Sequence, residues 1–158
     1  MTAQQTVVRL QRNISAPPER VYRAWLEPEL LQRWLAPGAM QVVRADVDER
    51  VGGHYRIWQE NVGGDVGGFE CELLELVPPE RIVWRWGFVG PARTDGPVFD
   101  SRLTVTLREA PGASTELTLV HEHLDALRDA MPAVADGVES GWAAVLNKLT
   151  ETMHRTES

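Results

Sequence analysis

Polar and apolar residues alternate along most of the middle of the chain. In residues 101–108, Leu103, Val105 and Leu107 alternate with arginine and threonine. Because successive side chains of a strand point to opposite faces, this pattern predicts a strand with one dry and one wet face. Similar segments joined by short Pro- or Gly-containing turns cover residues 42–48, 54–60, 69–77, 81–88 and 115–123. Such short connections favour antiparallel neighbours. In residues 69–77 the alternation breaks, which predicts a bulge or a barrel-like bend.

Helical patterns flank these strands. Residues 6–15 alternate like a strand, and Pro17 and Pro18 then fit the first turn of a helix. Pro28 ends that helix and begins a second one, which Pro37 stops. Near the end of the chain, one apolar stripe at helical spacing contains Val138, Trp142, Val145, Leu146, Leu149 and Met153. Such a helix must cover apolar surface, and the dry face of the sheet is the large one left. We therefore predict an α+β fold with a curved antiparallel sheet of about six or seven strands around a long C-terminal helix.

Composition narrows the class of protein. The length of 158 residues suits one domain over residues 1–158. The formal net charge of -7 opposes binding to nucleic acid, which needs a basic surface. No apolar run is long enough for a transmembrane segment and the first residues do not resemble a signal peptide, so we expect a cytoplasmic location. Cys71 is the only cysteine, which excludes an intrachain disulfide; we expect it to be a small buried hydrophobe.

Five motifs resemble a known family. They are ISAPPERVYRAWLEPELLQRWLAPG, DVDERVGGHYRIW, ELVPPERIVWRW, LTLVHEHL and GWAAVLNKL, in this order along the chain. Together they resemble bacterial homologues of the co-chaperone that activates the ATPase of the 90-kDa heat-shock protein, within the START-like (SRPBCC) superfamily. The resemblance implies the helix-grip fold. It also implies a deep, mostly apolar pocket between sheet and helix, which relatives use for small hydrophobic molecules and, in a minority, for catalysis.

Aromatic residues are the main candidates for lining such a pocket. Trp84 and Trp86 are two residues apart, so both side chains leave their strand by the same face, where they serve as core, as pocket wall, or as one of each. Tyr55 and Trp58 have opposite parity, so without a bulge at most one of them faces the pocket. The full set of candidate ligand-binding residues is Trp34 near the entrance, Tyr55, Trp58, Trp84, Trp86 and Trp142 as wall, and His121 as polar anchor.

Other residues suggest no catalytic or metal site. His121 and His123 are two apart, but a third ligand is missing, so we expect no metal. The alternation places His121 on the dry face of its strand, whereas it places Glu70 and Glu72 on the wet face of theirs. Ser101 lacks the G-x-S-x-G context of a hydrolase, and no phosphate-binding glycine motif is present, so we expect no cofactor and assign no catalytic residue.

Three functions agree with these observations. The first is binding of a small hydrophobic molecule, lipid-like or aromatic, in a cavity between the sheet and the C-terminal helix. The second is a protein-interaction module that binds or activates a heat-shock ATPase, or that self-associates, which should expose a patch outside the sheet. The third is a pocket enzyme of the cyclase or hydrolase type, which should hold a buried ionisable group with a perturbed pKa. The sequence favours the first, so we expect that the protein is not an enzyme.

Overall fold

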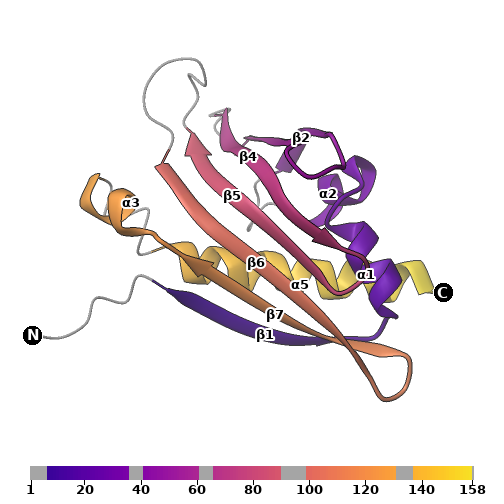
Figure 1. Ribbon diagram of the computed structural model, residues 1–158. Coiled ribbons are helices and arrows are strands. Elements are labelled where there is room, and N and C mark those ends of the chain that lie inside the picture. Colours follow the sequence, from indigo (N-terminus) through magenta and orange to yellow (C-terminus); the bar gives the residue numbers. More distant parts are fainter. Residues whose placement is uncertain (1–6, 36–40, 61–65, 90–98, 131–136, 158) are drawn as a thin grey trace, which may run out of the picture.

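Seven antiparallel strands form one curved sheet in the computed structural model of the chain (Figure 1). The structure describes residues 7–35, 41–60, 66–89, 99–130 and 137–157. The elements are β1 (Val8–Ile14), α1 (Pro18–Ala24), α2 (Pro28–Trp34), β2 (Gln41–Val47), β3 (His54–Glu60), β4 (Val66–Val77), β5 (Arg81–Val89), β6 (Phe99–Ala110), β7 (Ser114–Glu122), α3 (Asp125–Ala130) and α5 (Val138–Glu157).

The strand order follows from the short connections. The sheet runs β1-β7-β6-β5-β4-β3-β2, so β2 to β7 form an antiparallel meander in chain order. The first strand instead pairs with the last one, Val8 lying opposite His121. The predicted bulge in β4 is present, because the register with β5 shifts between Leu73 and Glu75. The expected α+β helix-grip arrangement is thereby confirmed.

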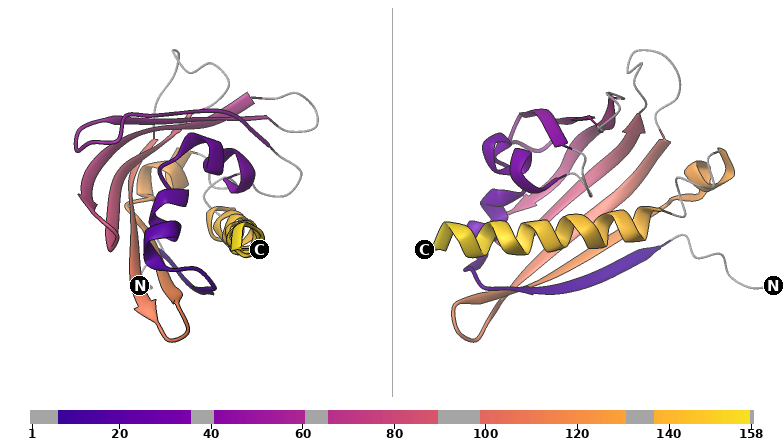
Figure 2. Two further views of the ribbon diagram at one scale, coloured as in Figure 1. Left: turned by 90° about the vertical axis from the view of Figure 1, so that its right-hand side faces the viewer. Right: turned by 180° about the vertical axis from the view of Figure 1, so that it is seen from behind.

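Three helices occupy the concave side of the sheet. The left view of Figure 2 shows the strands curving around α1, α2 and α5. The predicted apolar stripe of α5 is buried over its whole length, from Val138 to Met153. The helix packs along β1 and against α2 and α1. Burial of this stripe is what holds α5 in the curve of the sheet, since a helix gains most of its stability from such packing.

Two local features depart from the regular strand pattern. The sequence did not predict α3, a six-residue helix that follows β7 directly. His123 ends the strand with a φ of 62° and is exposed, so it does not continue the inward parity of His121. Because left-handed backbone breaks the alternation of a strand, the parity argument holds up to Glu122 and no further.

Candidate ligand-binding site

Five of the six tryptophans meet in the interior of the protein. Trp84 and Trp86 come from the concave face of β5, Trp34 ends α2, Trp25 directly follows α1, and Trp142 lies on α5. We call Trp25, Trp34, Trp84, Trp86 and Trp142 the tryptophan cluster; all five are buried. Thus three helical segments and the centre of the sheet each deliver indole rings to the same place.

Four of these rings contact one another in a closed circuit. The ring centroids are 5.5 Å apart for Trp25–Trp84, 5.7 Å for Trp84–Trp86, 5.4 Å for Trp86–Trp142 and 6.0 Å for Trp25–Trp142. Trp34 stands edge-on to Trp25 at 4.6 Å. Tyr55 contacts Trp84 at 5.4 Å and Trp86 at 5.9 Å. These are the distances of directly packed aromatic pairs, so neighbouring rings in the circuit touch.

The indole N–H groups of the cluster fall into two classes. Trp34 donates to the Ala24 carbonyl at 3.1 Å, and Trp142 donates to His121 Nδ1 at 3.0 Å. The Nε1 atoms of Trp25, Trp84 and Trp86 are also buried, but they have no hydrogen-bond partner. A buried donor without an acceptor costs about 1–3 kcal/mol of desolvation. Three such donors close together are unusual in a native interior and need an explanation.

A polar chain connects the cluster to three neighbouring strands. Trp142 donates to Nδ1 of His121, so this nitrogen is the unprotonated acceptor and the proton of the neutral ring is on Nε2. Nε2 lies 2.6 Å from Ser101 Oγ, and that hydroxyl donates to the Trp86 carbonyl at 2.9 Å. The hydrogen bonds therefore run in one direction, from α5 through β7 and β6 to β5. Burial lowers the pKa of His121 to about 3, so the ring is neutral near pH 7.

This direction is opposite to what a serine nucleophile requires. A histidine that activates a serine must accept the hydroxyl proton on the nitrogen that faces it. Here that nitrogen, Nε2, carries the ring proton and faces Ser101 as a donor. Its low pKa also makes His121 a weak base. The Ser101–His121 pair is therefore arranged for structure and orientation, and its geometry does not fit acyl hydrolysis.

The structure places the predicted site residues unevenly. Tyr55, Trp84, Trp86, His121 and Trp142 come together in the interior as one contiguous group. Trp34 joins them too, but it is fully buried and does not stand near an entrance as expected. The expectation for Trp58 is corrected: its parity is opposite to that of the buried Tyr55 and Ile57, so it lies on the other face of β3.

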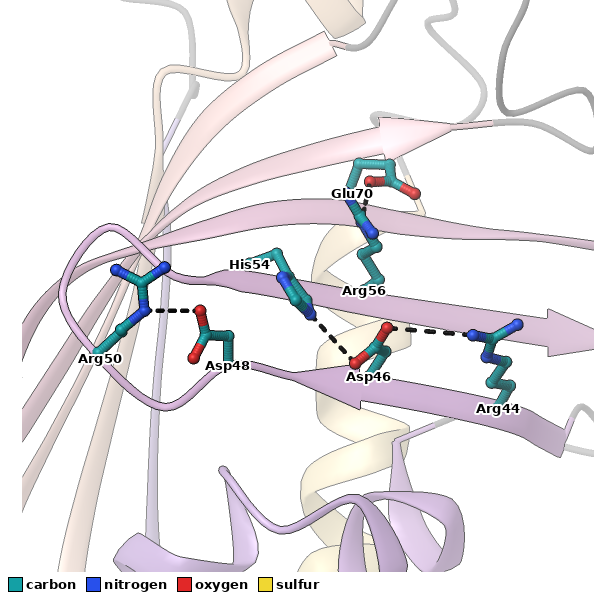
Figure 3. A network of polar contacts seen from close by, with 7 residues as sticks. All are labelled: Arg44, Asp46, Asp48, Arg50, His54, Arg56 and Glu70. Carbon is teal, nitrogen blue, oxygen red and sulfur yellow. Dashed lines mark hydrogen bonds and ion pairs between the residues drawn. The ribbon is translucent and has the colours of Figure 1, made fainter.

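On that outer face Trp58 belongs to a charged surface. The Arg44 guanidinium stacks over its ring at 4.5 Å from the centroid. Figure 3 shows the neighbouring side chains on and between β2, β3 and β4 pairing with one another. His54 Nε2 lies 3.0 Å from Asp46 Oδ1, and Arg56 Nε lies 3.1 Å from Glu70 Oε1. The hydrogen bond with His54 holds the pKa of the Asp46 carboxyl below its usual range. As the sequence indicated, Glu70 and Glu72 lie on this wet face; in the structure they pair with Arg56 and Arg85.

A shallow hollow of about 380 Å³ also lies on the outer face, over β1, β7 and β6. It is lined mainly by polar residues, among them Gln11, Thr106, Arg108, Glu116 and Thr118. Several already pair with each other, such as Arg108 with Glu116 at 3.1 Å. This hollow is not the apolar cavity between sheet and helix that the sequence suggested, and its lining does not fit a hydrophobic ligand.

Sequence reasoning missed two members of the site. Trp25 was not included among the binding residues, although it contacts three other indoles. Ser101 was set aside for lacking a hydrolase motif. The signal for Ser101 was present in the strand pattern, since it has the same parity as the buried Leu103, Val105 and Leu107.

The described residues form neither a metal site nor a membrane-spanning helix. No three of their His, Cys, Asp and Glu side chains come together as ligands of a metal ion. None of their helices is long and apolar enough to cross a membrane. Cys71 is buried, as expected for a small hydrophobe.

Comparisons with known proteins agree with this architecture. The model of the family described as Activator of Hsp90 ATPase homolog 1-like protein matches residues 15–154. A solved structure of a protein from Chromobacterium violaceum is 35% identical, with 92% of this chain and 96% of that chain covered and a TM-score of 0.75. One from Mesorhizobium loti is 28% identical, covering 95% and 98%, with a TM-score of 0.71. One from Nitrosomonas europaea shares the fold at 23% identity, covering 99% of both chains, with a TM-score of 0.78. No curated protein matches the chain.

Proposed function

The chain belongs to the family of Activator of Hsp90 ATPase homolog 1-like proteins, and from its interior we propose that it binds a small, largely apolar molecule bearing a hydrogen-bond acceptor. The binding site is the tryptophan cluster between the sheet and α5. Tyr55 and Trp142 form its wall, and His121 acts as the polar anchor by orienting Trp142. A cytoplasmic location and a single domain over residues 1–158 are part of the same proposal.

The unpartnered N–H groups of Trp25, Trp84 and Trp86 carry this proposal. An acceptor atom that reaches one of them removes a desolvation cost already present in the free protein. Apolar contact supplies the rest of the affinity: about 300 Å² of buried ligand surface at about 25 cal/mol per Å² is worth roughly 7 kcal/mol before the costs of ordering. That sum corresponds to micromolar binding or somewhat weaker.

Entry of a ligand requires the rings to separate. The ring centroids of Trp86 and Trp142 are 5.4 Å apart, so the two rings are in contact. A molecule between the sheet and α5 must therefore displace one of them. The element that moves is α5, because it contacts β5 at this point through side chains. Part of the binding energy is spent on this separation, so a probe that fits should bind more weakly than its buried area alone suggests.

A matched pair of probes tests the proposal. 2-Acetylnaphthalene and 2-ethylnaphthalene have similar shapes, but only the ketone carries an acceptor. We expect the ketone to bind at least about tenfold more tightly in calorimetric titrations, which corresponds to about one additional hydrogen bond. In ¹⁵N–¹H spectra, the indole signals of Trp25, Trp84 and Trp86 should shift on binding, while the signal of Trp58 on the outer face should not.

The Trp84→Phe and Trp58→Phe variants assign the indole signals of these two residues and test the role of each in binding. Trp84→Phe removes one free donor and should weaken binding of the ketone but not of 2-ethylnaphthalene. Trp58→Phe should change neither. Binding of both probes with equal affinity, shifts confined to Trp58, or no binding at all would each contradict the proposal.

A second candidate, a co-chaperone-like interaction module, is favoured by the Arg44–Trp58 stack. Arginine and tryptophan are enriched among residues that dominate protein interfaces. This pair lies on a sheet face that no described helix covers (Figure 2). The test is whether the chain stimulates ATP hydrolysis by a purified 90-kDa heat-shock protein, and whether a Trp58→Ala variant loses that stimulation. Stimulation that Trp58→Ala leaves intact would argue against this surface.

A further inference from the structure

Charge is distributed very unevenly between the interior and the surface of the protein. Among the residues whose burial the structure describes, no Asp, Glu, Lys or Arg side chain is buried. The buried polar or charged side chains are Gln59, Ser101, Thr115, His121 and Thr152. Of these, His121 and Ser101 lie in the polar chain that joins the tryptophan cluster to the sheet; the serine hydroxyl is uncharged and the His121 ring is neutral. Within the part of the chain whose burial is described, the tryptophan cluster therefore contains no formally charged side chain.

The free polar atoms of the cluster are of one kind. An indole nitrogen is a donor and never an acceptor, so Trp25, Trp84 and Trp86 offer N–H groups only. The hydroxyl of Tyr55 is already committed, since it donates to the Trp25 carbonyl at 2.6 Å. A ligand that fits this set supplies acceptors and needs no acceptor in return.

His121 cannot readily provide a positive charge for an anion. Its Nε2–H already donates to Ser101, and its Nδ1 already accepts from Trp142. Adding a proton to Nδ1 would turn that nitrogen into a donor facing the indole N–H of Trp142, and the two donors would repel. Both nitrogens of the ring are thus occupied in the neutral state. Moving a carboxylate into such a site without a counter-charge is strongly unfavourable.

From this arrangement we infer that the site selects uncharged molecules with carbonyl or ether oxygens, such as ketones and esters, and rejects carboxylates and phosphates. The inference rests on the proposed function, because it names the chemical class of ligand for the same site. It adds that a free acid enters only after it has taken up a proton.

An ester and its parent acid form the sharpest test. Methyl 2-naphthoate and 2-naphthoate share the ring and the carbonyl, but the acid is ionised at neutral pH. We expect the ester to bind at least about tenfold more tightly than the acid at about pH 7.5 in calorimetric titrations. Between about pH 8 and pH 6 the apparent affinity of the acid should rise about tenfold per pH unit, because its neutral fraction rises in that proportion. Affinity for the ester should stay constant over the same range.

Proton uptake gives an independent readout. Titrations in buffers with different ionisation enthalpies should show about one proton taken up per molecule of acid bound, and none per molecule of ester. A Trp58→Phe variant should reproduce both results, which separates the interior site from the arginine-rich outer face. If the acid binds as tightly as the ester at pH 7.5, or without proton uptake, the inference fails while the proposed function stands. If neither probe binds, the proposed function fails and this inference fails with it.

Discussion

The two faces of strand β5 differ in almost every physical property. Trp84 and Trp86 point into the concave side, where they are fully buried among other aromatic rings. Arg85, between them, points outward and lies 3.6 Å from Glu72 in a partly exposed ion pair. One strand therefore holds apolar side chains closed off from water beside charged side chains that water screens. Burial on the inner face therefore supplies stability and the proposed affinity for a ligand, whereas the outer face supplies charge and solubility.

The same contrast holds for hydrogen bonding. On the outer face, charged groups find partners in each other, as Arg56 does in Glu70, and water supplies whatever is missing. On the inner face water is excluded, so a missing partner has a real cost, and three indole donors bear it. The inner face is thus the region where small changes of atom type have large effects.

The largest expected effect comes from breaking the contrast at adjacent positions of β5. Trp86→Ala should lower the free energy of unfolding by about 3–5 kcal/mol, because it leaves a large cavity among packed rings. Arg85→Ala should lower it by about 0–1 kcal/mol, because exposed ion pairs contribute little. Urea unfolding followed by circular dichroism measures both. Equal losses for the two variants would show that the two faces do not differ in the way described.

A second comparison uses variants of two tryptophans that both lie on the inner side of the sheet. Trp34→Phe removes an N–H that donates to the Ala24 carbonyl, whereas Trp84→Phe removes an N–H that has no acceptor. Both lose similar ring volume. Trp34→Phe should therefore be the less stable variant by about 1–3 kcal/mol, because it leaves a buried carbonyl unpaired while the other relieves an unpaired donor. If Trp84→Phe proves equally destabilising in chemical denaturation, its N–H has a partner in solution, such as water.

Much of this contrast could be predicted from the sequence. Alternation in residues 101–108 and 115–121 is strict, so parity alone places Leu103, Leu119 and His121 on the buried side. The same reasoning distinguishes Tyr55 from Trp58. Tyr55 shares its parity with Ile57, whereas Trp58 shares its parity with His54 and Arg56. A strand that is polar on one side places even a tryptophan at its surface.

Other parts of the site depend on long-range packing. Trp25 joins the cluster because α1 and α2 fold into the concave side of the sheet, and no local pattern specifies that docking. The direction of the Trp142–His121–Ser101 chain requires the register of β6 with β7, which pairs Leu103 with His121. The packing of helices against the sheet also decides which indole N–H groups lack acceptors, because small shifts of a ring make or break a hydrogen bond. Periodicity carries information about faces but not about such distances.

The pH dependence of stability should reveal the neutral state of His121. Its pKa is about 3 in the folded protein against an ordinary value of 6.5, so the unfolded chain takes up a proton first as the pH falls. Stability from this group is therefore complete above about pH 6.5 and is lost progressively down to about pH 3. Between pH 6.5 and 5 the loss should be roughly 1.5 kcal/mol.

A His121→Gln variant isolates this contribution in urea unfolding at several pH values. Glutamine can still accept from Trp142 and donate to Ser101, but it does not titrate. The variant should lose less stability over this range than the natural protein, while His54→Asn on the outer face should keep the His121 contribution. Parallel curves for the natural protein and His121→Gln would mean that His121 is not held neutral by burial.

The smallest expected change in stability comes from substituting Gly141, which lies at the border of the tryptophan cluster. Gly141 precedes Trp142 on α5, and a Cβ added there would meet no atom within 4 Å, so the glycine is not needed for close packing. Gly141→Ala should therefore raise the free energy of unfolding by about 0.5–1 kcal/mol through helix propensity, and Ala143→Gly should lower it by a similar amount. Thermal unfolding of both variants checks the direction of each change in stability.

Because Gly141 is next to Trp142, binding of methyl 2-naphthoate gives a second readout. Unchanged affinity in Gly141→Ala places this position outside the tryptophan cluster, whereas a selective loss of binding would extend the inner face by one residue along α5.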